Sequence, residues 1–86
     1  MGKEYIISLC KVSLEAAKKA DAAYHMGDKT EGLKLALLAT GKAASALMLY
    51  LPLAWGARKD SEQTSHLAEV KDWVRMALVA SIDVYF

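Results

Sequence analysis

Three side chains in the second half of the chain have types and spacing that could ligate a metal ion. Glu62, His66 and Glu69 lie at positions i, i+4 and i+7, so on a helix all three project from one face. Carboxylate metal sites in helical bundles need a Glu-x-x-His from each of two helices and two further Glu residues. The order here is His-x-x-Glu on one helix. We therefore interpret the three residues as a solvated helix face and expect no metal or other cofactor.

The stretch from Thr40 to Ala43 is similar to the end of a phosphate-binding loop, in which a glycine-rich turn cradles phosphate and Lys precedes Ser or Thr. Two features argue against that site. Ala43 stands where the magnesium-binding hydroxyl residue belongs, and Gly32 lies nine positions before Gly41 instead of five. We interpret Lys42 as a cation that reaches the surface past an apolar helix.

Cys10 is the only cysteine, so neither an intramolecular disulfide nor a multi-cysteine metal site is expected. This usage is typical of a reducing compartment, and residues 1–15 lack the apolar run of a signal peptide, so we expect a cytoplasmic protein. Cys10 lies in an apolar helical pattern, which favours an inert core thiol over a nucleophile. No Ser, His and Asp arrangement indicates covalent catalysis.

The chain has 11 basic and 10 acidic residues and a net charge of +1, with no basic arm or acidic tail. Nucleic-acid affinity comes largely from clustered Lys and Arg, so a nucleic-acid partner is not expected. A domain of this size buries only about 60 to 65% of its surface on folding. Because 55% of the residues are apolar, a single copy should leave apolar surface exposed.

Helical periodicity without sustained alternation predicts an all-α fold, in which residues 1–86 form one small antiparallel bundle of three main helices. Gly27 suits the left-handed position after the first helix, and Asp28 with Glu31 forms a capping pair for the second. The first helix is expected over residues 4–25, and its buried face should contain Leu9, Ser13, Ala16, Ala17, Ala20 and Tyr24.

The second helix, expected over residues 29–51, is apolar around most of its circumference in its later turns. That pattern predicts a central helix buried by its neighbours. Gly32 and Gly41 each weaken a helix interior by up to about 1 kcal/mol, so close packing of another backbone would explain both.

Pro52 should stop or kink the second helix, which leaves residues 52–57 as a linker or a short fourth segment with Trp55 folded inward. Asp60 or Ser61 should then cap the third helix. Its inward positions should be Leu67, Val70, Val74, Ala77, Ser81 and Val84, with Trp73 beside them.

Residues 35–55 contain a single charge and have about the length that a bilayer core requires. Lys42 lies near the middle, where a cation costs roughly 2.5 to 3.5 kcal/mol on insertion scales, and Pro52 weakens the pattern further. The flanking segments are amphipathic in the manner of bundle helices. We therefore favour a central bundle helix over a membrane span.

The hairpin over residues 14–48 joins an Ala-rich helix, a Gly-Asp turn and a second helix with recurrent Ala and Leu. It resembles the microtubule-interacting and trafficking domain, a three-helix bundle that binds helical peptide motifs. It also resembles the HEPN-type helical domain, whose dimeric members include RNA-cleaving toxins. These resemblances cover roughly half of the chain.

The HEPN resemblance implies a ribonuclease motif in which Arg and a polar residue precede a His near the start of a helix. Arg58-Lys59 and His66 are the matching residues, although Lys59 stands where Asn, Asp or His is usual. The resemblance implies that Arg58 would stabilise phosphate charge and that His66 would act on the 2′-hydroxyl or the leaving group. Two protomers would then join their copies of the motif at a dimer cleft.

We predict a small non-enzymatic helical module that self-associates as a homodimer through its apolar central and C-terminal helices. The alternative function is HEPN-like RNA binding or cleavage by Arg58 and His66. A helical peptide or another protein is an alternative partner, and a membrane is not expected. The predicted interface consists of Leu47, Leu49, Leu51, Trp55, Trp73, Ala77, Val84 and Phe86.

Overall fold

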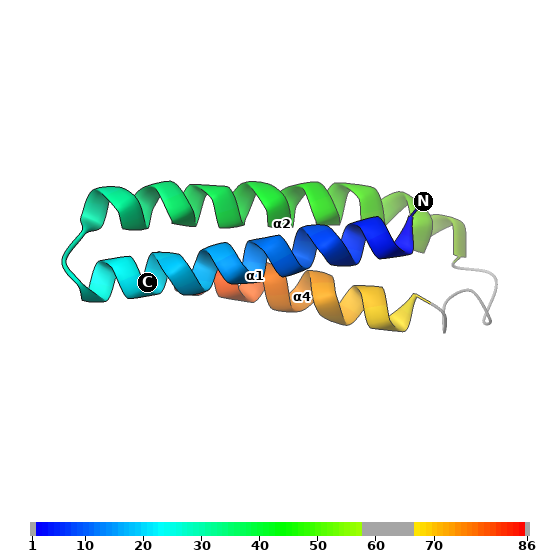
Figure 1. Ribbon diagram of the computed structural model, residues 1–86. Helices are drawn as coiled ribbons and strands as arrows, with labels where there is room; N and C mark the ends of the chain where they lie inside the picture. Colours follow the sequence, from blue (N-terminus) through cyan, green and yellow to red (C-terminus); the bar gives the residue numbers. More distant parts are fainter. Residues whose placement is uncertain (1, 58–66, 86) are drawn as a thin grey trace.

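A computed structural model describes residues 2–57 and 67–85, and within these ranges the chain forms three helices and no strand. Helix α1 spans Lys3–His25, α2 spans Lys29–Ala57 and α4 spans Ala68–Asp83. Successive helices run antiparallel and form an elongated bundle of 48 × 20 × 15 Å (Figure 1). The predicted all-α fold is confirmed, whereas the predicted caps Asp60 and Ser61 lie outside the described residues.

The turn between α1 and α2 has the geometry that its sequence predicts. Gly27 has a φ of +82°, and its N–H donates to the Tyr24 carbonyl at 3.0 Å. The Asp28 N–H donates to the Ala23 carbonyl at 2.9 Å, which completes the pair of bonds typical of a helix that ends at a left-handed glycine. Asp28 Oδ1 accepts a hydrogen bond from the Glu31 N–H at 3.1 Å and so caps α2.

Most residues at the contacts between the helices are small. Along each helix they recur at spacings that alternate between four and three positions, which is the spacing by which helices interlock along a shared seam. Small side chains let the backbones approach closely. The predicted buried faces of the first and third helices are confirmed, with Tyr24, Leu67 and Val84 half-buried at their margins. The buried series are Ile6, Cys10, Ser13, Ala17 and Ala20 on α1, Gly32, Ala36, Ala39, Ala43 and Ala46 on α2, and Val70, Val74, Ala77 and Ser81 on α4.

Two buried hydroxyl groups join all three helices near the middle of the bundle. Ser13 Oγ on α1 donates to the Ala39 carbonyl of α2 at 2.8 Å and lies 3.3 Å from Ser81 Oγ on α4. Ser81 Oγ is also 2.8 Å from the Ala77 carbonyl, to which it donates. Every buried side-chain N or O atom in the described part of the chain has a hydrogen-bond partner. The layer therefore fixes the register of the helices without leaving a buried polar atom unsatisfied.

The two glycines in the first half of α2 have different environments. A Cβ atom on Gly32 would lie 2.8 Å from carbons of the Tyr24 ring, so this glycine allows the ring to pack directly on the α2 backbone. A Cβ atom on Gly41 would have no heavy atom within 4 Å, apart from its own local helix. The predicted close contact is therefore present at Gly32, where a side chain makes it and not another backbone. At Gly41 the prediction is wrong, because no other part of the same chain packs there.

Helix α2 differs from the prediction at its C-terminal end, because it does not stop at Leu51 but continues to Ala57 with Pro52 inside it. The fourth segment expected at residues 52–57 is therefore the last part of α2. Pro52 cannot donate to the carbonyl four residues before it. Both Pro52 and Met48 are exposed, so water can hydrate the carbonyl that loses its partner.

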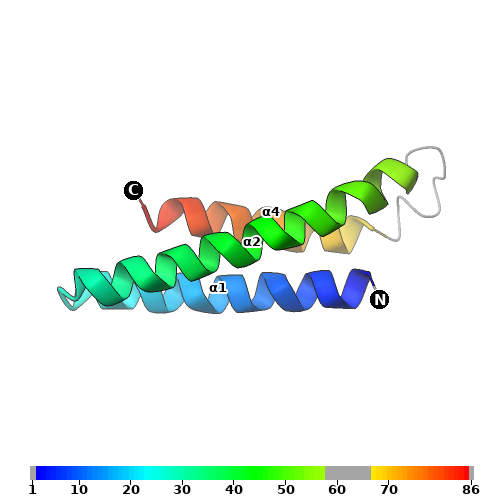
Figure 2. The same ribbon diagram turned by 90° about the horizontal axis from the view of Figure 1, so that it is seen from above.

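Trp55 is not folded inward as predicted, since it is 71% exposed. The C-terminal end of α2 extends beyond the N-terminal end of α1, so the end of α2 has no α1 beside it (Figure 2). The prediction that α2 is buried by its neighbours is also wrong. Its buried face consists almost entirely of Ala and Gly, while most of its leucines point outward.

Candidate functional site

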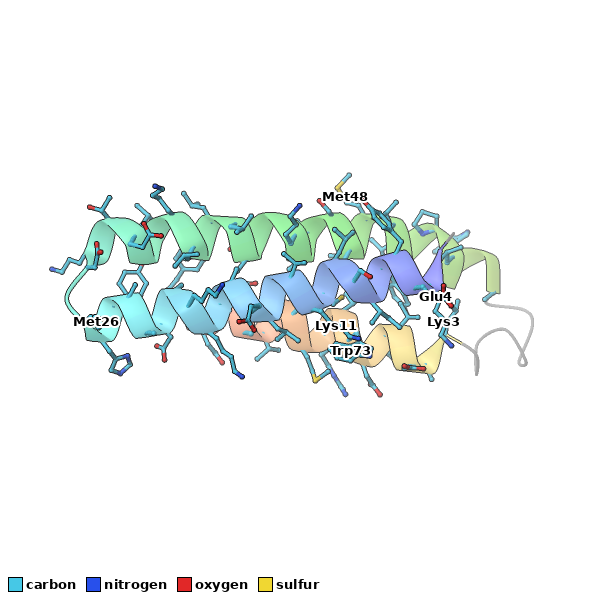
Figure 3. The ribbon with its side chains drawn as sticks, in the orientation of Figure 1. Lys3, Glu4, Lys11, Met26, Met48 and Trp73 are labelled. Carbon is cyan, nitrogen blue, oxygen red and sulfur yellow. The ribbon has the colours of Figure 1, made fainter. Side chains whose placement is uncertain are left out.

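The side of α2 that is turned away from the core presents large apolar side chains to solvent. Met48 and Trp55 are 72% and 71% exposed, and Leu37 and Leu51 are more than half exposed. Figure 3 shows Met48 pointing away from α1 and α4. Six residues on this side repeat at spacings of four and three, and we call them the outer seam: Leu37, Gly41, Ala44, Met48, Leu51 and Trp55.

Charge is absent from most of this surface, since α2 contains no charged residue from Ala43 to Ala57. A second exposed apolar row lies along the α1 side of α2 and contains Leu38, Leu49 and Leu53. Contiguous apolar surfaces of more than roughly a few hundred Å² mark interaction sites on soluble proteins. The exposed face of α2 is therefore the strongest candidate for a functional surface.

Helix α4 adds exposed apolar residues of its own, namely Met76, Val79 and Ile82. Its C-terminal end is joined to α2 by Tyr85, whose hydroxyl lies 3.0 Å from Thr40 Oγ. The Thr40 hydroxyl also donates to the Ala36 carbonyl at 2.9 Å. This contact fixes the end of α4 beside the first half of α2.

The predicted interface residues on α2 divide into two groups. Leu49, Leu51 and Trp55 are exposed. Leu47 is half-buried and packs against the core of its own chain.

The predicted interface residues on α4 lie mostly within the bundle. Ala77 is fully buried and presents no surface to a partner. Val84 is half-buried and packs against the core cluster of Ala16, Ala17 and Ala39. Trp73 is half-buried, with Lys11 Nζ 5.5 Å from the centre of its ring (Figure 3). Phe86 lies outside the described residues.

The chemical candidates do not form a catalytic site in the part of the chain that the structure describes. Arg58, Glu62 and His66 lie outside that part, so the motif implied by the HEPN resemblance is not placed. Within residues 2–57 and 67–85, no three His, Cys, Asp or Glu side chains gather as metal ligands. Cys10 is fully buried, as predicted, and burial raises the pKa of its thiol, which keeps it protonated and unreactive.

A groove of about 660 Å³ lies between α1 and α4. Its lining includes apolar residues such as Leu14, Ala17 and Ala80, together with acidic and basic side chains, Glu15, Lys18 and Asp83 among them. Because the groove has no cluster of one charge and no buried nucleophile, it offers no arrangement for catalysis.

Helix α2 is also long and apolar enough to cross a membrane, and it is the one helix in the described part of the chain that meets this criterion. Core helices of soluble proteins meet the same criterion, but they are mostly buried. In α2 only 22% of the most apolar 18-residue window is buried. The rest of this window is therefore not buried by the other helices of the bundle.

Comparisons of the chain with protein families, with curated proteins and with solved structures found no match. The evidence that the α2 surface is a functional site therefore comes from the structure alone. Sequence reasoning missed Leu37 and Met48, and it did not recognise that α2 has two apolar repeats on different sides. The size difference between the Ala repeat and the Leu, Met and Trp repeat is the signal that would have separated them.

Proposed function

We propose that this protein is a small non-enzymatic assembly module that self-associates as a homodimer through the exposed faces of α2 and α4. The outer seam is the observation that supports this proposal most strongly. Four of its six residues, Leu37, Met48, Leu51 and Trp55, carry large exposed apolar side chains. They lie on a helix that packs against two others. An exposed apolar surface of that kind is typical of an interaction site, because covering it removes apolar area from water.

The energetics favour a two-fold partner. Burying a large apolar side chain stabilises by about 1.5–3 kcal/mol, whereas association itself costs roughly 4–15 kcal/mol. In a two-fold interface every residue contributes twice, once from each copy. The burial of the leucines, Met48 and Trp55 from two copies therefore offsets the cost of association. We also propose a cytoplasmic location for the resulting dimer.

Solution mass by light scattering after size exclusion tests the proposal. We expect the mass of a dimer at micromolar concentration. We expect Met48→Asp to shift the protein to a monomer that remains helical by circular dichroism. Ser8→Asp is the matched control, because it adds the same charge at an exposed position of α1 outside the seam, and it should leave the dimer intact.

A stable monomer of the wild-type chain at tens of micromolar would overturn the proposal. The same preparation is mixed with phosphatidylcholine vesicles and separated by flotation. A monomeric protein that floats with the vesicles would assign the surface to lipid and would also overturn self-association. A dimer that stays in the unbound fraction supports it.

A further inference from the structure

We draw no further inference here: the strongest candidate, the groove between α1 and α4, carries acidic and basic side chains together in its lining, and nothing in the structure shows what covers it.

Discussion

Ser13 lies where the three helices meet, and its hydroxyl reaches the Ala39 carbonyl of α2 as well as Ser81 of α4. Ser13→Ala would remove both interactions and leave Ser81 with one partner. A net hydrogen bond contributes about 1 kcal/mol to stability, with a larger cost when a buried group loses its partner. We expect Ser13→Ala to lower the free energy of unfolding by about 1–2 kcal/mol in urea titrations.

Ser8→Ala is the matched control for that substitution, because Ser8 is on the same helix and is exposed. Both changes alter helix propensity equally, so their difference isolates the buried contacts. Equal stabilities of the two variants would show that the hydroxyl layer does not contribute to the stability of the bundle.

Gly32 provides a second test of close packing at a single position. Gly32→Ala would place a methyl group 2.8 Å from the Tyr24 ring and force the ring to move. Overpacking of this kind typically costs about 1–3 kcal/mol, and the gain in helix propensity offsets part of it. We expect a net loss of thermal stability, with Gly56→Ala as the control because no atom lies within 4 Å there. A stabilised Gly32→Ala variant would contradict the packing of Tyr24 on α2.

At the scale of elements, α1 and α4 could be oriented from the sequence because charged residues mark their outer faces. Lys11, Glu15 and Lys18 form a stripe on α1, and the small residues opposite them are buried as predicted. The later turns of α2 carry no charge, so hydrophobicity alone does not distinguish its inner side from its outer side. The bundle turns the Ala side of α2 inward because the buried face of α1 is itself mostly small, and two such faces approach closely.

Pro52 is the residue at which the predicted boundary of a helix was wrong. Its position predicted the end of a helix, yet α2 continues to Ala57. Proline in a helix interior costs about 3 kcal/mol relative to Ala, and exposure of this site to water reduces that cost. We expect Pro52→Ala to raise the free energy of unfolding by about 1–3 kcal/mol in denaturant titrations. An unchanged or lower value would mean that the helix path around Pro52 depends on the proline.

At the scale of the whole molecule, the excess of apolar surface was predictable from composition and length, but its location was not. Helices that meet through Ala form a thin bundle, only 15 Å across in its smallest dimension. Such a core has no room for the leucines of α2. They remain outside, together with Met48 and Trp55. Which residues are displaced depends on which helix faces meet, and that is a property of the assembled bundle.

Thermal unfolding of the whole protein should therefore depend on its concentration. A native dimer is stabilised by mass action over unfolded monomers, by about 2.7 kcal/mol when the available partner is at a hundredfold excess over the dissociation constant. We expect the Tm of the wild-type chain to rise steadily between 1 and about 100 µM in calorimetry or circular dichroism. Met48→Asp should have a lower Tm that does not change with concentration. Since a monomer has no such dependence, a constant Tm for the wild-type chain would contradict reversible dimer formation over this range and leave the outer face of α2 without the cover that we propose.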